Sequence, residues 1–486
     1  MSDLKKGTIV IGIDLGTTNS LVSVPDSKEK PTIIPNDRGE RKTPSVVTIQ
    51  TESILIGELA KSQAVLNHES TVLMVKRYMG TDKTWEINGK EWKACDISSE
   101  ILKNLRAIAE TYIGKEVDDA VITVPAYFND SQREETLKAA EKAGLKVHKL
   151  FNEPTAAALA YGLQKSENDQ LLVFDFGGGT LDITLLEVKN GAFLVRGVGG
   201  DSKLGGIDFD KIIVEYARKN FMDIHKIDLL KDPMAYQQLL NQAESAKIDI
   251  SSVPETKIMI PYITVTKKGP LHLNINLSRK TFNKLAEPIL EKIKHILEDT
   301  LKSSGLPKDW PKSVVLVGGT SRIPCVKDLL KDFLHESIIF KQDLNPEEIV
   351  AVGAGVLAGI INKTYPEVVI KDIVSHDLGI EDDSGEFVTI IERGEVYPIQ
   401  KSRLFTTTND NQAQVAVHVQ EKNVIEDRCN SLGYFVVEGF KEAKAGELDI
   451  PVTFEIDENG ILRVSIEEEK SKIKKEVEFK LMGDLV

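Results

Sequence analysis

The sequence contains little cysteine, and its cysteines form no recognisable metal or disulfide pattern. The three residues, Cys95, Cys325 and Cys429, lie far apart and include no CxxC pair. An odd number of distant cysteines argues against a disulfide-rich secreted domain and against a zinc site. We therefore expect reduced thiols and a cytoplasmic protein.

Long apolar runs and basic stretches are missing as well. No segment is apolar over the roughly 20 residues that a membrane-spanning helix needs. The charged start at 1–7 has no apolar core of the kind found in signal peptides. The formal net charge is −14, and there is no basic stripe with interleaved aromatic residues. Because an acidic surface repels phosphate backbones, we expect neither a membrane nor a nucleic acid as a partner.

A chain of 486 residues with 41% hydrophobic residues is long enough for more than one globular domain. Up to about residue 365, short apolar strands such as 8–13 and 171–174 alternate with helical patterns, which indicates an α/β architecture. The helices that we expect are 98–112 capped by Ser98 or Ser99, 130–143 capped by Asp130, 279–301 capped by Ser278, and 346–361 capped by Asn345.

The pattern changes beyond residue 365, where a period of two dominates. The expected strands are 387–391, 412–419, 431–437, 452–456, 461–466 and 474–479. Asn459-Gly460 between two of them is a strong hairpin signal. We therefore predict three parts: an α/β domain at 1–365, a linker at 366–374, and an all-β sandwich at 375–486.

Two segments of the α/β part resemble each other. IGIDLGTTNSLVSV at 11–24 and VFDFGGGTLDITLLEV at 173–188 both run from a strand through Asp, a glycine turn and Thr into another strand. Glycine allows the backbone to approach a ligand closely, and successive N–H groups with threonine hydroxyls can cradle phosphate oxygens. An ordinary turn is the alternative for each loop alone, but the similarity favours two related halves that face one cleft.

A third glycine segment, VVLVGGTSRIP at 314–324, places two glycines between a strand and a helix start. A helix N-terminus favours anions, so this segment is a candidate phosphate or nucleoside platform, although a plain strand-to-helix turn has the same pattern.

These motifs closely resemble those of the DnaK-type 70-kDa heat-shock chaperones. The resemblance includes the three glycine segments, TVPAYFNDSQR at 123–133, NEPTAAALAYGL at 152–163 and LGGIDFD at 204–210. It covers nearly the whole chain, and the phosphate loops are more distantly similar to those of actin and sugar kinases. It implies an actin-like, ribonuclease H-like duplicated α/β ATPase domain, followed by a β-sandwich that binds peptides.

The resemblance also implies roles for individual residues of a Mg²⁺-dependent ATPase that binds ATP or ADP, with K⁺ as a further candidate ion. The catalytic set would be Lys76, Glu153, Thr180, Asp182, Asp14 and Asp175, and the last two would hold Mg²⁺ through water. The ATP-binding set would be Gly16, Thr17, Thr18, Asn19, Gly177, Gly178, Gly179, Gly205, Gly206, Glu244, Lys247, Ser251, Gly318, Gly319, Thr320, Arg322 and Glu347. Positioning and charge stabilisation are what phosphoryl transfer requires.

Communication between the two domains is implied at Pro125, Arg133 and Asp372. For Pro125, tertiary packing is an equally fair interpretation. The linker VVIKDIV at 368–374 departs from the family, which usually has a near-continuous leucine run before the aspartate. Lys371 interrupts that run, and this puts the strength of the coupling in doubt.

The β part is similar to the family's peptide-binding sandwich. By position, the residues that would contact a peptide are Ile380, Asp383, Phe405, Thr408, Val415 and Val417. Four of these could equally be core residues of a sandwich. Asp383 stands where the family commonly has an apolar residue that arches over the peptide, opposite Thr408. A carboxylate there should weaken binding of apolar peptides and favour basic ones.

The family normally continues into a helical lid, whereas this sequence stops at Val486, so we expect a short form without the lid. Whether that is natural or reflects truncation stays open. The implied partners are unfolded or extended polypeptides, a J-domain co-chaperone and a nucleotide exchange factor.

The expected function is an ATP-dependent chaperone. The main alternative is a nucleotide-gated interaction protein, or exchange-factor-like relative, with little turnover. A small-molecule kinase would need a sugar pocket and would have no use for a C-terminal sandwich, and an actin-like filament protein would not explain the linker.

Overall fold

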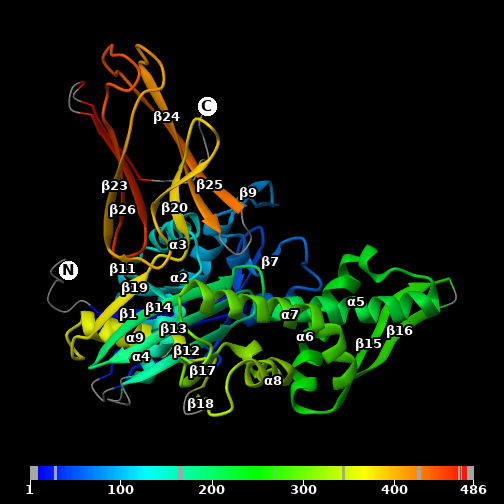
Figure 1. Ribbon diagram of the computed structural model, residues 1–486. Coiled ribbons are helices and arrows are strands. Elements are labelled where there is room, and N and C mark those ends of the chain that lie inside the picture. The colour runs from blue at the N-terminus through cyan, green and yellow to red at the C-terminus, as the bar shows by residue number, and fades with distance from the viewer. Residues whose placement is uncertain are drawn as a thin grey trace.

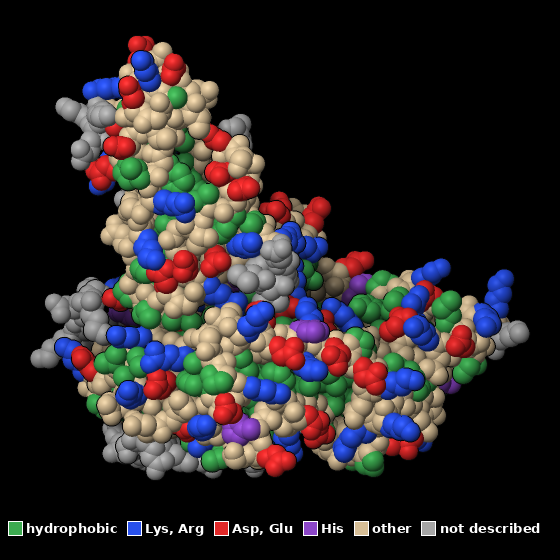
Figure 2. All heavy atoms as spheres, viewed as in Figure 1, with side chains coloured by type: hydrophobic (Ala, Val, Ile, Leu, Met, Phe, Trp, Pro, Cys, Tyr) green, Lys and Arg blue, Asp and Glu red, His purple; other side chains and the backbone are tan. Residues whose placement is uncertain are grey.

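The computed structural model shows a larger α/β part from which a narrower β part projects (Figures 1 and 2). The residues that it describes are 9–26, 30–162, 168–267, 269–341, 345–423, 428–468, 471 and 473–478. Thr8 and Phe479, the expected ends of two strands, lie outside these residues, as does Val486. The predicted boundaries at 365 and 374 stay predictions.

The first lobe of the α/β part is built on a sheet with the strand order β3-β2-β1-β10-β11. β1 runs antiparallel to β2 and parallel to β10, which in turn is parallel to β11. The strands are β1 (Val10–Asp14), β2 (Asn19–Val24), β3 (Thr32–Ile33), β10 (Asp119–Val124) and β11 (Lys146–Asn152), with β4 (Thr43–Pro44) also paired to β2. Every residue of β1 is buried, as expected for a central strand covered on both faces.

The second lobe repeats this arrangement. Its sheet contains the order β14-β13-β12-β17-β18, in which β12 is antiparallel to β13 and parallel to β17. The strands are β12 (Asp169–Phe176), β13 (Leu181–Lys189), β14 (Ala192–Asp201), β17 (Ser313–Val317) and β18 (Ile339–Lys341). Two sheets with the same order and the same strand directions agree with the internal similarity that the sequence shows.

Two helices lie between these sheets and contact each other. α4 (Glu153–Gly162) packs on the second sheet and α9 (Ile349–Ile361) on the first. Glycine permits these close approaches: a Cβ on Gly353 would lie 1.9 Å from the carbonyl oxygen of Ala156, and one on Gly12 would lie 2.3 Å from the nitrogen of Gly355. Backbone contact therefore fixes how closely α9 approaches α4 and β1.

The remaining elements surround the two sheets. In the first lobe they are β5 (Val46–Ile49), β6 (Ile54–Ile56), α1 (Glu58–Gln63), β7 (Thr71–Leu73), η1 (Val75–Tyr78), β8 (Thr84–Ile87), β9 (Lys90–Lys93), α2 (Ala94–Ile113) and α3 (Asp130–Lys142). In the second they are α5 (Gly206–His225), η2 (Leu229–Lys231), α6 (Pro233–Ser252), β15 (Glu255–Thr266), β16 (Gly269–Ser278), α7 (Arg279–Ser303), η3 (Gly319–Arg322) and α8 (Pro324–Phe333). None of the helices in the described residues is long and apolar enough to cross a lipid bilayer.

The β part consists of two four-stranded antiparallel sheets, β21-β20-β24-β25 and β23-β26-β27-β28, which share one apolar core. Its strands are β20 (Asp377–Glu381), β21 (Phe387–Ile391), β22 (Val396–Tyr397), β23 (Ile399–Phe405), β24 (Gln414–Asn423), β25 (Arg428–Glu438), β26 (Ile450–Ile456), β27 (Leu462–Glu468) and β28 (Ile473–Glu478). The predicted sandwich is thus observed. Gly460, at φ +75°, closes the β26–β27 hairpin as its sequence indicated.

The linker forms a strand that joins the two parts. β19 (Val369–Ile373) pairs in parallel with β14 at 369–371 and in antiparallel with β22 at 372–373. Lys371 causes no break, because it lies on the exposed face of this strand whereas Asp372 and Ile373 are buried. The seven-stranded sheet therefore runs from the second lobe through the linker into the β part.

The helix caps predicted from sequence were correct at Ser278 but wrong at three other helices. Ser278 accepts a hydrogen bond from the Thr281 nitrogen at the start of α7. The cap of α3 is Asn129 instead of Asp130, because the Asp130 carboxylate is turned toward the β part.

The other two helices begin elsewhere. α2 starts at Ala94, so Ser98 and Ser99 lie inside it, and Asp96 accepts the hydrogen bond from the Lys93 nitrogen instead. α9 starts at Ile349, and Asn345 stabilises the turn before it by accepting from the Glu347 nitrogen.

Candidate functional site

The two similar loops of the sequence meet in the cleft between the lobes. A Cβ on Gly178 would lie 1.9 Å from the Thr18 hydroxyl, and one on Gly179 would lie 2.4 Å from the Thr17 hydroxyl. Only glycine allows the β12–β13 loop to approach the β1–β2 loop this closely. The expectation that two hairpins face one cleft is confirmed.

The loop of the second lobe is held by elements that follow it in the chain. The Gly206 and Ile207 nitrogens, at the start of α5, donate to the carbonyls of Gly177 and Gly178 at 3.0 Å each. The Thr320 hydroxyl donates to the Gly177 carbonyl at 2.8 Å. The N-terminus of α5 therefore lies beside the loop, where its partial positive charge favours an anion.

A cavity opens where these loops meet. Of the residues predicted to bind or cleave ATP, it is lined by Asp14, Gly16, Thr17, Thr18, Asn19, Lys76, Glu153, Asp175, Gly177, Gly178, Thr180, Gly318, Gly319 and Glu347. The structure brings them together from six separate stretches of sequence. Sequence reasoning missed Lys42, which also lines the cavity and pairs with Glu347 at 2.9 Å.

Arg77 is a second residue that sequence reasoning missed. It belongs to the first lobe but donates to the carbonyl of Gly179 at 3.0 Å and pairs with Asp208 of α5 at 2.5 Å. It therefore ties the two lobes together beside the two glycine loops. Its position next to Lys76 is the one signal that could have drawn attention to it.

The centre of this cavity is rich in buried charge. Lys76 forms an ion pair with Glu153 at 2.5 Å, and both side chains are nearly inaccessible. Burial, and after it the charge of Glu153, raises the pKa of Asp14 to about 7. The same two causes, in the same order, raise the pKa of Asp182 to about 7, although the Tyr127 nitrogen donates to its carboxylate at 2.9 Å. The site holds more negative charge than Lys76 alone compensates.

The carboxylates Asp14 and Asp175 fit a hydrated divalent cation. The Oδ2 atom of Asp175 is buried and accepts no hydrogen bond, and burial raises the pKa of this group well above its ordinary value. Across the described residues, no three His, Cys, Asp or Glu side chains form a direct ligand set. Mg²⁺ usually keeps several of its waters and binds one or two carboxylates together with phosphates, so two carboxylates beside a phosphate site suffice.

Of the residues predicted to contact adenosine, some line one cavity and the others do not. Glu244 and Lys247 of α6 line a second cavity, where Lys247 pairs with Asp210 at 2.8 Å and Glu244 pairs with Lys61 of the first lobe at 3.1 Å. Gly206 lies beside them, because the Lys247 ammonium donates to its carbonyl. A Cβ on Gly205 would lie 2.4 Å from the carbonyl oxygen of Gly178, so Gly205 lies against the β12–β13 loop.

Ser251 and Arg322 line neither of these cavities. Ser251 donates to the Lys247 carbonyl within its own helix, and Arg322 donates to Asn345 at 2.7 Å. Their roles in adenosine binding stay predictions.

The predicted coupling residues lie at the boundary of the two parts. Asp372 of the linker strand is buried and accepts hydrogen bonds from Asn152 at 2.8 Å and from Thr155 at 3.2 Å. Arg133 donates to the same Asn152 side chain at 2.8 Å and to the Asn459 carbonyl of the β part at 3.4 Å. One connected set of hydrogen bonds thus joins α3, β11, the linker and the β26–β27 hairpin.

Asn152 and Thr155 are the members of this network that sequence reasoning missed. They belong to the NEPT segment, and no local pattern distinguishes them from helix-capping residues. Pro125 lies in the turn between β10 and α3, where its carbonyl accepts from the Phe128 nitrogen at 3.2 Å. Its role in coupling stays a prediction.

The predicted peptide residues fall into two groups. Ile380 and Val417 are buried in the core of the sandwich, and Phe405 and Val415 pack against that core while partly exposed. Asp383 lies in an exposed turn at 382–385, and Thr408 is exposed and bonded to Gln412. Among the described residues no hydrogen bond joins Asp383 to Thr408, and the predicted arch of Asp383 over a peptide stays a prediction.

Comparison with known protein families adds one finding. A family model described as Hsp70 protein matches residues 10–486. The match includes both lobes, the linker strand and the β-sandwich.

Proposed function

The chain belongs to the Hsp70 protein family, whose members are ATPases with chaperone activity, and on that premise we propose that ATP bound between its lobes controls the peptide affinity of its sandwich. We propose further that the two lobes are the duplicated actin-like halves of the ATPase domain. The observation that carries this proposal is the linker strand, which pairs with both parts at once. A rotation of the second lobe would displace β14, and with it the strand that holds the sandwich.

The residues of the cleft support ATP binding and hydrolysis. The loops at 15–18 and 177–180, with the start of α5, would hold the β- and γ-phosphates through backbone N–H groups and the hydroxyls of Thr17, Thr18 and Thr180. Asp14 and Asp175 would hold Mg²⁺ through its waters, and that ion would supply charge neutralisation at the phosphates. Glu153 and Asp182 can accept hydrogen bonds from an attacking water.

Lys76 has two tasks in this proposal. Its ammonium lies against Glu153 and lines the phosphate cavity, so it can offset charge that develops on the γ-phosphate. Because the ion pair is buried, the ammonium is held in place before ATP binds. Catalysis here would rest on positioning and electrostatics, as phosphoryl transfer generally does.

The sandwich is the proposed site for unfolded or extended polypeptides. Phe405 and Val415 combine partial exposure with contact to the core, which suits an apolar pocket at the surface. A J-domain co-chaperone and a nucleotide exchange factor are proposed partners on the grounds of family membership alone. Linkage requires that ATP and peptide influence each other's affinity by the same factor.

The test is the steady-state ATPase rate of the whole chain at fixed Mg²⁺, measured alone, with an apolar peptide and with a basic peptide. Slow basal turnover that rises with a peptide is expected. Tight ATP binding without turnover or peptide effect would instead support the nucleotide-gated interaction protein. Stimulation by the basic peptide alone would show that the acidic turn selects the clients.

A further inference from the structure

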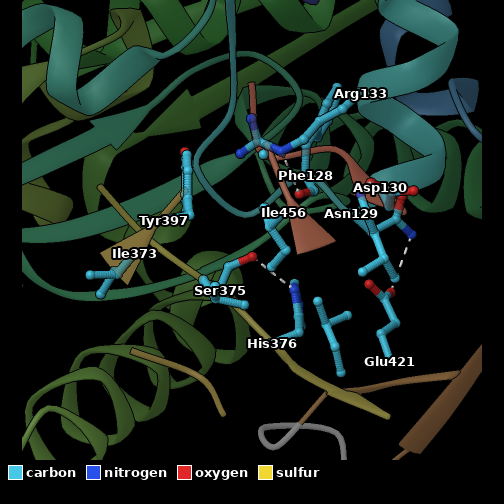
Figure 3. Close-up of a pocket in the computed structure, with 14 residues that line it drawn as sticks. Phe128, Asn129, Asp130, Arg133, Ile373, Ser375, His376, Tyr397, Glu421 and Ile456 are labelled. Carbon is cyan, nitrogen blue, oxygen red and sulfur yellow. Dashed lines mark hydrogen bonds between the residues drawn. The ribbon is translucent and has the colours of Figure 1, made fainter. Parts of the chain in front are cut away.

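A separate cavity lies at the boundary between the ATPase domain and the sandwich, away from the phosphate loops. Its walls include Asn129, Asp130 and Arg133 from the ATPase domain and His376, Tyr397 and Glu421 from the β part and its approach (Figure 3). Two of these residues are carboxylic acids that come from different domains. Both are close to complete burial, at 8% exposure for Asp130 and 3% for Glu421.

Within the described residues, the hydrogen-bond partners of Glu421 on β24 are neutral. Its Oε1 atom accepts from the amide of Asn129 across the boundary and from that of Asn430 on β25, both at 3.3 Å. Figure 3 shows Asn129 and Glu421 facing each other. Over the part of the chain that the structure describes, burial and the two asparagine amides are the influences on this carboxyl, and no ion pair with a lysine or arginine is among them. Burial without a cation favours the protonated acid and raises the pKa of Glu421 to about 7.

Asp130 contributes a second acid from the other side. Its Oδ1 atom accepts from the Leu462 nitrogen of β27 at 2.7 Å, which is a direct contact between the domains. Burial raises the pKa of Asp130 well above its ordinary value, and the negative charges of Glu134 and Glu421 raise it further by smaller amounts. Both groups lose this environment when the sandwich leaves the ATPase domain.

Arg133 and His376 also line this cavity, and further ionisable groups belong to the elements that form it. On α3, Glu134 pairs with Lys138 at 3.4 Å, and Arg133 donates to Asn152 and to backbone carbonyls. On the linker, burial also raises the pKa of Asp372. The pKa of His376 shifts in the opposite direction. Burial lowers it to about 3, with smaller contributions from the charges of Arg393 and Arg133.

We propose that docking of the sandwich onto the ATPase domain takes up protons at the Asp130–Glu421 pair, so that mild acidification favours the docked arrangement. Each carboxylic acid contributes most to docking at a pH at which it is protonated in both the docked and the undocked arrangement, because docking then requires no proton uptake. For Glu421 that holds below its ordinary pKa of 4.5, and the contribution is lost as the pH rises toward about 7. The effect on peptide affinity rests on the proposed function, whereas the proton uptake itself does not.

The experiment measures docking directly, by energy transfer between dyes on the two domains of the whole chain. Glu442→Cys and Thr111→Cys give exposed labelling sites in the sandwich and in the ATPase domain. Cys429→Ser removes the exposed native thiol, and Cys95 and Cys325 are buried. The docking equilibrium is recorded between pH 5 and 8, without nucleotide and with ATP, for the parent chain and for Glu421→Gln.

The decisive quantity is the ratio of the docking constants of the variant and the parent at each pH. His376 and Asp372 contribute to both chains, so the ratio reports Glu421 together with its electrostatic coupling to Asp130. We expect it to rise by up to about tenfold per pH unit from pH ~5 and to level off above pH ~7. Asp130→Asn should show a rise of the same sign, and the exposed carboxylate variant Glu438→Gln should show none.

A ratio that stays constant over this range would overturn the proposal, and so would the same rise in Glu438→Gln. Because energy transfer needs no hydrolysis, these outcomes are independent of whether the ATPase test succeeds. Loss of docking in Glu421→Gln at every pH would mean that the ionised carboxylate is required, which also overturns it.

Discussion

The phosphate cleft and the domain boundary both bury carboxylates, but they compensate them differently. In the cleft, Asp14, Asp175 and Glu153 surround a buried lysine, and one oxygen of Asp175 has no partner. At the boundary, Glu421 and Asp130 meet amide and backbone N–H donors. Burial raises pKa values in both regions. The buried lysine and the unpartnered carboxylate oxygen of the cleft fit the cation site that we propose there, whereas the neutral donors at the boundary fit a protonated acid.

This difference shows that a buried carboxyl side chain is not by itself evidence of a catalytic site. What distinguishes the two regions is the surrounding donors: glycine loops, a helix start and Lys76 in one, and asparagine side chains in the other. Four substitutions test the distinction, in order of the expected effect.

Lys76→Ala should have the largest effect. It removes the cation beside the phosphates and leaves Glu153 buried without its partner, so we expect single-turnover hydrolysis to slow by about 10²–10³-fold. ATP binding, measured separately by calorimetry, should fall much less. Lys115→Ala, an exposed lysine, is the matched control. Hydrolysis at the parent rate in Lys76→Ala would remove this lysine from the mechanism.

Thr180→Ala should slow turnover by about 10–100-fold while ATP still binds. The hydroxyl lies in the second phosphate loop, and a hydrogen bond to a charged group is worth roughly 1.5–3 kcal/mol. Thr180→Ser keeps that hydroxyl and should restore most of the rate. Equal rates in all three proteins would show that Thr180 only shapes the loop.

Asp372→Ala tests the boundary. It removes the acceptor of two hydrogen bonds, from Asn152 and Thr155, so docking should weaken by about tenfold or more. Energy transfer between the labelled domains measures this, and the peptide-stimulated part of the ATPase rate should fall with it. Lys371→Ala, on the exposed face of the same strand, should change neither. A stronger effect from Lys371→Ala would contradict the assignment of Asp372 as the anchor.

Asp383→Met should have the smallest effect. The side chain is exposed near the predicted peptide site, and exchanging a charge for an apolar group should tighten an apolar peptide by roughly 1 kcal/mol, or about fivefold. Fluorescence anisotropy of labelled apolar and basic peptides would measure this, with Glu442→Met as a control elsewhere on the sandwich. Unchanged affinity for both peptides would mean that the acidic turn does not contact them.

Local patterns predicted the elements well but not their ends. Alternation predicted six strands of the sandwich but missed β20, β22 and β23, and glycine spacing predicted the paired loops. Asp130 looked like a helix cap because that is what aspartate does beside a helix start, but its carboxylate binds Leu462 more than 300 residues away. Sequence reasoning had no access to that partner, so it assigned the cap one residue too late.

The sequence by itself indicated the α/β and all-β parts and the two similar glycine loops, because these depend on short-range periodicity or on what glycine permits. The other residues around the cleft were predicted from the resemblance to a family. Only the tertiary structure decided that the linker is a strand and that Asn152 joins Arg133 to Asp372. It also decided that Glu421 of the sandwich and Asp130 of the ATPase domain line the same cavity. These features depend on backbone and side-chain partners distant in the chain, and no local pattern encodes which partner a buried polar group will find.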